Sequence, residues 1–504
     1  MPGLAMKTRR LRVAGTLLAT SLMMACTVLG PDYQEPETRI QDDWSGVETP
    51  TLVSNPPSSP RWWSTAFNDP VLDELIAKGI AQNLDVQSAG LRVLQARQSL
   101  NIAIGNQYPQ EQEVSGSAEK ERSNKRTEEI YNIGFNLSWE ADVWGRFTLA
   151  VRAAEAQLDA SVADYDGVMV TMLADIASNY LKIRTLQRRI EVAKANVKLQ
   201  EENLDIARTK FEGGLVTELD VDQATTLLYN TRAQVYAFDQ QLQQTRNILA
   251  VLLGEPPRGL NPALMKPAPL PTVAPEISIG MPQELLRRRP DIRSAERQLA
   301  AQSSQIGFAI TELYPHFSLG GSIGSTVDTA EGLDFDDMFG SDASNWNVMG
   351  GFQWDVLNYG RLKSNIRLQD ALFQQLATNY RNSILQAQSE VENSIVAYLS
   401  NQRQSHEYRL ATDAALRASS VSSEQYQDGL VDFDTVINVL ASLRAQQDLQ
   451  ASTEGLVAAS LVEVYRALGG GWEIRDGKAP DTLLPEETRD QMLQRTKYWE
   501  GHLP

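Results

Sequence analysis

The stretch WEADVWGR at Trp139–Arg146 recurs as WDVLNYGR at Trp354–Arg361, 215 residues further along the chain. Each copy opens with tryptophan and an acidic residue and closes with Gly-Arg. Before each copy, apolar and polar residues alternate as they do in a strand with one apolar face. After each copy, apolar residues recur at helical spacing. Both stretches therefore predict strand-to-helix junctions. The residues identical in the two copies are Trp139, Gly145 and Arg146 in the first and Trp354, Gly360 and Arg361 in the second.

Further matches show that the chain is a tandem duplication. YQDGLV at Tyr426–Val431 answers FEGGLV at Phe211–Val216, again 215 residues apart, whereas Tyr314-Pro315 answers Tyr108-Pro109 at an offset of 206. The nine extra residues fall in an acidic loop at Asp328–Asp342. Each copy reads as helix, β-hairpin, very long helix, turn and helix.

Helical periodicity marks the long elements of each copy. A first helix is expected from Asp69 to about Gly105, where Tyr108-Pro109 follows and disfavours continuation. The helix that begins at Gly145-Arg146 is expected to reach about Glu212, which gives it a length of roughly 100 Å. Its second half carries apolar residues every seventh position, which predicts coiled-coil packing. The heptad positions are Ile183, Ile190, Val197, Leu204 and Phe211.

Strict alternation predicts a strand at about 130–140, and a weaker strand at about 110–119 is expected to pair with it in a hairpin. Alternation also predicts strands at about 315–325 and 345–356, which are expected to form the second hairpin. The charged run KERSNKRTEE (Lys120–Glu129) is expected to be the first hairpin loop. Strands of nine to eleven residues can cross a membrane when tilted. Four strands cannot close a barrel, and open edges do not occur in lipid. Because one chain has too few strands for a barrel, an oligomer is expected, and three chains would supply twelve strands.

Composition excludes several classes of protein. A net charge of −18 over 504 residues is a poor match to nucleic acid, because it repels phosphates. One cysteine and three histidines leave little for a disulfide framework or a metal site. The sequence has no catalytic triad and no phosphate-binding loop, so no catalytic residue, metal or bound cofactor is predicted.

The N-terminus has the form of an export signal, with a basic start, an apolar run over Val13–Ala25 and the lone cysteine, Cys26, at its end. This resembles the bacterial lipoprotein signal, in which the cysteine receives a thioether-linked diacylglycerol and an N-acyl chain. By that resemblance Thr27 favours the outer membrane over the inner one. The alternative is an ordinary signal followed by a buried free thiol.

The expected organisation has six parts. These are a signal at 1–25, a lipidated extended tether at 26–68, a first repeat at 69–257, a Pro-rich equatorial linker at 258–280, a second repeat at 281–472 and a C-terminal equatorial segment at 473–504.

These features together resemble the TolC/OprM-like outer-membrane efflux channels, in their RND-type lipoprotein (NodT) branch. The resemblance rests on the duplicated plan, the two junction stretches and ACTVLGPDYQEP at Ala25–Pro36. It implies a mainly α protein with a small β part, a homotrimer with a twelve-stranded β-barrel in the outer membrane of a Gram-negative bacterium, and a twelve-helix periplasmic α-barrel. It further implies a passive duct that serves a periplasmic adaptor and an inner-membrane RND pump.

The same resemblance places a gate at the two helical turns. Asp220 matches an aspartate of the family's closing network, and Tyr426 matches its tyrosine partner. Val431 stands where the arginine is expected, and Asn438 stands where a constricting aspartate is expected. Asp432 and Asp434 are candidates for an acidic ring in its place. The alternative for Asp220, Asp432 and Asp434 is that they are solvated turn residues or helix N-caps.

Two further sites have open alternatives. The turns at Gly214-Leu215 and Gly429-Leu430 are expected to dock the adaptor, and they also have the form of helix C-caps. Trp139 and Trp354 are either interfacial aromatics at the barrel rim or packing residues at the junction. For the function, a conduit for type I protein secretion is the alternative to small-molecule efflux, and a periplasmic coiled-coil scaffold is more remote.

Overall fold

The computed structural model describes residues 28–44, 52–53, 60–123, 126–257, 259, 262–273, 277–278 and 286–503. The signal at 1–25 and Cys26 therefore lie outside the described residues. The chain forms two compact units, each built from separate stretches. The first consists of the N-terminal segment up to Glu37, Val93–Ser161 and Ser294–Arg381, and the second consists of Thr38–Arg92, Val162–Arg293 and Asn382–Pro504.

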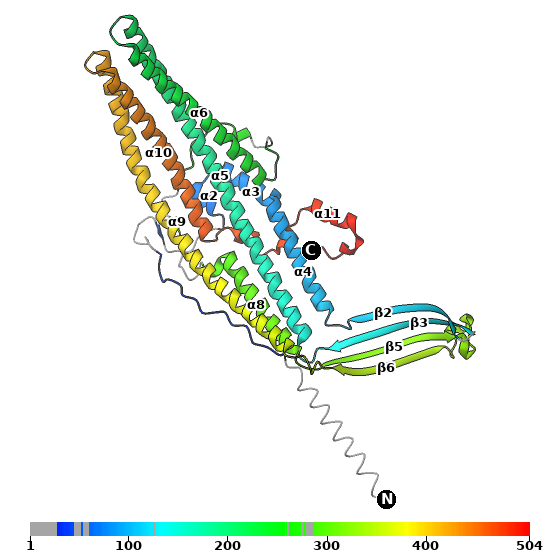
Figure 1. Cartoon of the computed structure of the whole chain (residues 1–504). Coiled ribbons are helices and arrows are strands. Elements are labelled where there is room, and N and C mark those ends of the chain that lie inside the picture. Colours follow the sequence, from blue (N-terminus) through cyan, green and yellow to red (C-terminus); the bar gives the residue numbers. More distant parts are fainter. Residues whose placement is uncertain are drawn as a thin grey trace. The chain divides into compact units, whose positions relative to one another are not determined.

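A four-stranded antiparallel sheet dominates the first unit (Figure 1). Its order is β2-β3-β5-β6, so each repeat contributes one hairpin and the pairing of β3 with β5 joins the two repeats. β2 and β6 are the edge strands. The strand bounds are Glu111–Ser123 for β2, Arg126–Ala141 for β3, His316–Asp328 for β5 and Ser344–Gln353 for β6.

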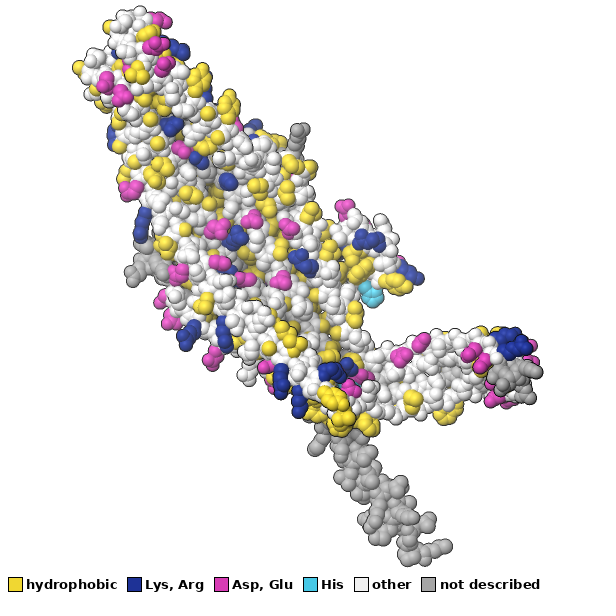
Figure 2. Space-filling view, in the orientation of Figure 1, with side chains coloured by type: hydrophobic (Ala, Val, Ile, Leu, Met, Phe, Trp, Pro, Cys, Tyr) yellow, Lys and Arg dark blue, Asp and Glu magenta, His cyan; other side chains and the backbone are white. Residues whose placement is uncertain are grey.

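The expected loop at Lys120–Glu129 is wrong, because the charged run continues both strands of the first hairpin. Lys120 pairs with Glu129 in the ladder, and their side chains form an ion pair of 2.5 Å. Backbone pairing does not depend on apolar side chains. The charged residues therefore show where the apolar part of the two strands ends, whereas the strands themselves continue. Figure 2 shows acidic and basic side chains at the loop end of the sheet.

The acidic loop at Asp328–Asp342 contains two 3-10 turns, η2 at Thr329–Glu331 and η3 at Phe335–Phe339. Their apolar residues form a small core with the end of β5. Val327 and Met338 are buried there, and Tyr131 of β3 packs beside them. The longer loop is therefore an ordered cap on one end of the sheet.

The two faces of the sheet differ in character. The ladder registers place alternate residues of all four strands on one face that carries exposed apolar side chains. These are Val114, Ile133, Phe135, Phe317, Leu319, Ile323, Trp346, Val348 and Phe352. The opposite face carries glycines and hydrogen-bonded polar side chains. There Asn132 donates to Ser117 Oγ at 3.2 Å, and Asn136 donates to Ser115 Oγ at 3.0 Å.

Two helical hairpins of equal length follow the two strand hairpins. In the first repeat α5 spans Arg146–Glu212 and α6 spans Glu218–Leu252. In the second repeat α9 spans Arg361–Gln427 and α10 spans Phe433–Ala467. The long helices have 67 residues each and the returning helices have 35 each. The helix predicted to reach Glu212 is confirmed, and no helix in the described part of the chain is long and apolar enough to cross a membrane.

The single helix expected from Asp69 to Gly105 is wrong, because the chain breaks at Asn83. α3 ends at Gln82 and α4 spans Leu84–Gly105. The Asn83 side chain accepts a hydrogen bond from Val86 N at 2.9 Å, as an N-cap does, and donates to Leu252 O at 2.8 Å. The break thus stacks the start of α4 on the end of α6.

The second repeat builds the same joint with different chemistry. Arg289, which stands at the position equivalent to Asn83, donates to Ala467 O at 2.6 Å and so ties the end of α10 to the start of α8 (Pro290–Thr311). Because both joints use a side chain to satisfy a helix-terminal carbonyl, the stacked helices leave fewer orphan acceptors.

The expected extended tether is wrong at its end. Trp62–Phe67 form a helix, α2, directly before α3 (Pro70–Gln82). Trp62 is buried and stacks on Tyr465 at 4.9 Å between ring centroids. Upstream, Leu52–Val53 (β1) pairs in parallel with Ile277–Ser278 (β4) of the Pro-rich linker, which also contains the 3-10 turn η1 at Pro262–Leu264. Burial of the tryptophans makes this segment part of the core.

A buried acid holds the C-terminal segment in place within the second unit. Arg475 reaches Asp166 at 2.7 Å, and Arg293 reaches the same carboxylate at 3.1 Å. Asp166 is fully buried. The segment contains η4 at Trp472–Arg475, η5 at Pro480–Leu483, α11 at Glu486–Arg495 and η6 at Lys497–Trp499.

Candidate functional site

The two junction tryptophans make equivalent hydrogen bonds. Trp139 Nε1 donates to Gln107 O at 3.4 Å, and Trp354 Nε1 donates to Leu313 O at 2.9 Å. Gln107 and Leu313 are matched positions, each one residue before a Tyr-Pro pair. Trp139 is half-buried and Trp354 is 52% exposed. Each indole thus ties the end of one strand to the loop that precedes its hairpin partner.

The rest of the junction motif also has matched geometry. Gly145 has φ +75° and Gly360 has φ +83°, a region that other residues rarely adopt. Directly after each glycine, the arginine turns back to the acid that follows the tryptophan. Arg146 lies 3.1 Å from Glu140. In the second repeat Arg361 makes the same contact with Asp355, again six residues before it. This shared ion pair explains why both copies of the motif contain the acidic residue and Gly-Arg.

The first junction is held more firmly than the second. Asp142 caps α5 by accepting from Phe147 N at 3.0 Å and Thr148 N at 2.9 Å. The matched position in the second repeat is Leu357, which is 83% exposed. Glu140 also contacts His316 Nδ1 at 2.8 Å. The shared motif therefore has more hydrogen-bond partners around it in the first repeat than at the matched positions of the second.

The first described residues of the chain lie against the first junction. Leu29 N donates to Trp144 O at 3.2 Å. A Cβ atom added to Gly145 would lie 2.9 Å from Val28 Cα, so the glycine leaves room for the segment. Cys26 precedes Val28 by two residues.

The turn glycines at the ends of the helical hairpins are also equivalent. Gly214 and Gly429 have φ values of +71° and +75°. The next residues, Leu215 and Leu430, donate their backbone N–H to the carbonyls of Lys210 and Gln425, both at 2.8 Å. Their side chains are 75% and 73% exposed. The turns are thus αL helix caps that present a leucine to solvent.

Two of the candidate gate acids act as helix caps in this structure. Asp220 accepts from Thr217 N at 2.8 Å in a capping box at the start of α6. Asp432 is the N-cap of α10 and accepts from Thr435 N at 2.9 Å. Hydrogen bonds from the Thr435 side chain and backbone hold the pKa of Asp432 below its usual range. Capping of helices and a role in gating are physically compatible.

Asp434 and Asn438 lie one helical turn apart on α10, and Asn438 Nδ2 donates to Asp434 Oδ2 at 3.1 Å. Both side chains are exposed. The polar pair thus orients one carboxylate near the tip without burying it.

Tyr426 is the buried member of the candidate gate, with 4% of its surface exposed. Its ring lies 5.1 Å from that of Phe433. Burial raises the pKa of Tyr426, and the negative charge of nearby Asp220 raises it further. The sequence reading missed Lys210, whose Nζ lies 3.9 Å from the centre of the Tyr426 ring.

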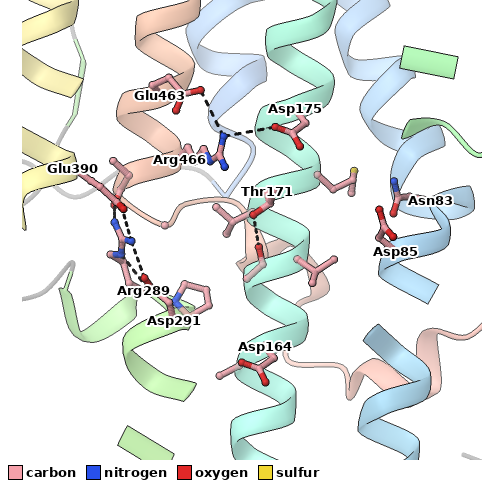
Figure 3. Close-up of a pocket in the computed structure, with 18 of the residues that line it drawn as sticks. Asn83, Asp85, Asp164, Thr171, Asp175, Arg289, Asp291, Glu390, Glu463 and Arg466 are labelled. Atoms are coloured by element: carbon pink, nitrogen blue, oxygen red, sulfur yellow. Dashed lines mark hydrogen bonds and ion pairs between the residues drawn. The ribbon is translucent and has the colours of Figure 1, made fainter. Parts of the chain in front are cut away.

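A cavity of about 1160 Å³ lies in the second unit, and the sequence did not predict it (Figure 3). Arg289 bridges Asp291 and Glu390, at 2.8 Å from each. Burial raises the pKa of Asp175, and the positive charge of Arg466 opposes only part of that rise. Acidic and basic side chains gather on its wall, namely Asp85, Arg92, Asp164, Asp175, Arg289, Asp291, Glu390, Glu463 and Arg466.

Comparison with known proteins gives consistent results. The family model described as outer membrane efflux protein matches residues 75–255 and 281–470. Nodulation protein T of Rhizobium leguminosarum bv. trifolii is 30% identical over 460 residues, which cover 90% of this chain and 96% of that protein. The pyoverdine export outer membrane protein OpmQ of Pseudomonas aeruginosa is 30% identical over 472 residues, covering 90% and 97%.

Solved structures agree with the fold. The outer-membrane channel OprN aligns with a TM-score of 0.82 and 28% identity, covering 88% of this chain and 99% of that one. The CmeC outer membrane channel of Campylobacter jejuni aligns with a TM-score of 0.81 and 21% identity, covering 92% and 100%. The mainly helical fold with a small sheet is therefore that of the TolC-like channels.

Proposed function

The chain belongs to the outer membrane efflux protein family, and on that premise we propose that three copies assemble into one exit duct. The sheet carries this proposal. Its edge strands β2 and β6 each pair on one side only within the described chain, and one face of the sheet exposes large apolar side chains. Strand addition between copies would satisfy both edges and close a barrel of twelve strands with its apolar face toward lipid.

The polar face of the sheet suits a water-filled interior. Thr326 Oγ1 donates to Asn132 Oδ1 at 2.7 Å, and Asn345 Nδ2 donates to Thr326 Oγ1 at 2.9 Å. These bonds extend across three strands. Small residues such as Gly134 and Gly324 alternate with them, which leaves room for solvent in a closed barrel.

The helical hairpins would form the periplasmic part of the duct, with two long and two returning helices from each chain and twelve helices in the trimer. The polar wall of the cavity around Arg289 and Arg466 supports this arrangement, because ion-paired side chains at an open surface remain hydrated. A duct with such a wall passes its cargo without chemistry. Its family consists of channels rather than enzymes.

We further propose that the hairpin tips meet a periplasmic adaptor, with Gly214, Leu215, Gly429 and Leu430 at the contact. Two exposed leucines on rigid αL caps supply apolar anchors at low entropic cost. Through the adaptor the duct would serve an inner-membrane RND pump.

Asp220, Tyr426, Asp432, Asp434 and Asn438 are proposed as the gate. All five lie on the first helical turns after, or the last turn before, the tip. Three symmetry-related carboxylates that converge on an axis repel one another unless cations or protons lie between them. Asp434→Ala tests the ring in planar bilayers, where unchanged conductance and cation dependence would count against it.

Lipid anchoring is proposed for Cys26, with an S-diacylglycerol and an N-acyl chain holding the protein to the outer membrane. Two or more acyl chains suffice for stable anchoring. The position of Val28 beside Gly145 supports the proposal. Cys26→Ser is expected to lose radiolabelled palmitate but still form channels, and undiminished labelling would refute the modification.

The cargo is proposed to be small molecules such as drugs, toxic organics or metals. OpmQ is named for pyoverdine export and a Pseudomonas putida relative, TtgF, for toluene efflux. Both are outer membrane proteins of small-molecule export, which favours this reading over type I protein secretion. The four-stranded sheet is unexplained by a coiled-coil scaffold.

One experiment tests the assembly. Purified full-length protein is expected to have the mass of a trimer in detergent, and to produce discrete conductance steps in a planar bilayer. A monomer that never conducts would overturn the duct. Susceptibility of a deletion strain to a panel of drugs and solvents then identifies the cargo.

A further inference from the structure

One lysine joins the two helical hairpins of the same chain. Lys210, in the last turn of α5, donates from Nζ to the carbonyl oxygen of Tyr426 at 2.6 Å. The same ammonium lies 3.9 Å from the centre of the Tyr426 ring. Tyr426 belongs to the last turn of α9. The first repeat therefore supplies a cation to the C-terminal end of a helix in the second, where the helix dipole favours positive charge.

The contact sits at the edge of an apolar cluster between the two hairpins. The cluster includes members of α5, α6, α9 and α10, namely Leu204, Ala207, Ala224, Leu227, Leu228, Tyr426, Phe433, Val436 and Leu440. The Tyr426 hydroxyl is buried and has no hydrogen-bond partner in the part of the chain that the structure describes. The lysine thus uses the carbonyl and the ring of Tyr426, and the hydroxyl takes no part.

Comparison of the two repeats shows that the equivalent positions of the other hairpin cannot make this contact. Phe211 is the residue matched to Tyr426, and Gln425 is matched to Lys210. Phe211 is 43% exposed, whereas Tyr426 is buried. In a ring in which hairpins of the two kinds alternate, the seam within a chain would carry the ammonium. The seam between chains would present glutamine and phenylalanine in its place.

We propose that Lys210 is a positioning residue of the gate, which holds the two hairpin tips of one chain together and so keeps the duct closed. This inference rests on the proposed function and adds a residue to the gate. Separation of the tips requires the charge-assisted hydrogen bond and the cation–π contact to break together. Removal of the ammonium lowers that barrier.

The test is single-channel recording of full-length protein in planar bilayers. Lys210→Met removes the donor and the charge but retains a long apolar side chain, and we expect its open probability to rise about tenfold. Lys210→Arg retains both interactions and is expected to stay near the wild type. Lys198→Met removes an exposed lysine from the same helix and serves as the charge-matched control.

The outcomes separate the possible failures. If Lys210→Met behaves as Lys198→Met does, the role of Lys210 is refuted while the duct stands. If neither the wild type nor any variant forms channels, the proposed function itself fails.

Discussion

The guanidinium of Arg146 lies 3.1 Å from the carboxylate of Glu140, and Arg361 stands in the same relation to Asp355 at 3.3 Å. In each repeat this pair bridges the end of a strand and the first residue of a 67-residue helix. The acid and the arginine are six positions apart in sequence, with a glycine of positive φ between them. The reversal of the chain at that glycine brings the two charges together.

The two arginines are expected to differ in their contribution to stability. The Arg146 side chain is 29% exposed and also contacts Glu312 at 3.1 Å, whereas the Arg361 side chain is 69% exposed. Arg146→Ala removes the guanidinium from two partly buried carboxylates, leaving Glu140 with His316, and should cost about 1–3 kcal/mol. Arg361→Ala should cost at most about 1 kcal/mol. Thermal unfolding in detergent compares the pair, and equal losses would contradict this ranking.

The junction glycines form a second matched pair. Gly145→Ala and Gly360→Ala both place a Cβ atom at positive φ, at a cost of roughly 1–2 kcal/mol each. Only at Gly145 would the Cβ also meet Val28, whereas at Gly360 it faces open space in the described chain. We expect Gly145→Ala to expose residues 28–30 to protease and Gly360→Ala not to. Equal protection of the N-terminal segment in both variants would show that the close approach is unimportant.

The buried acid beneath the C-terminal segment gives a larger effect. Asp166→Ala leaves Arg475 and Arg293 without their carboxylate, and Arg475 is only 11% exposed. Loss of one member of a buried ion pair costs about 3–5 kcal/mol. We expect faster proteolysis after residue 472 together with a lower melting temperature. Asp159→Ala, on the same helix but with a 62% exposed side chain, is the control and should change neither measurement.

The N-cap of α10 should make stability depend on pH at the acidic end. The pKa of Asp432 is held low in the folded protein by Thr435. A lowered carboxyl pKa stabilises the fold above the unfolded value, near 3.9, and this stabilisation is lost as the pH falls through the folded value. Asp432→Asn keeps an acceptor without the charge. Its melting temperature should be lower than that of wild type at pH 7, and the difference should shrink as the pH falls below the unfolded pKa of about 3.9. A difference independent of pH would exclude the carboxylate charge.

Periodicity and duplication predicted the strands, the long helices and the junctions, because each of these follows from the order of apolar and polar residues within a short stretch of sequence. The break at Asn83 was missed because apolar spacing continues through it. In the structure Leu84 is 66% exposed, so it had counted toward the wrong face. Asn83 itself, a favoured N-cap residue, was the available signal. The tie from Lys210 joins residues 216 positions apart, and no local pattern encodes such a contact.

The loop at Asp328–Asp342 has a practical consequence. It makes the second repeat nine residues longer than the first, yet the long and returning helices on both sides of the duplication have kept identical lengths. Extra residues there shift neither strand register nor heptad phase. The duplicated fold therefore accommodates two loop lengths at this position, and an affinity tag grafted into it should leave the strands and helices of the rest of the chain undisturbed.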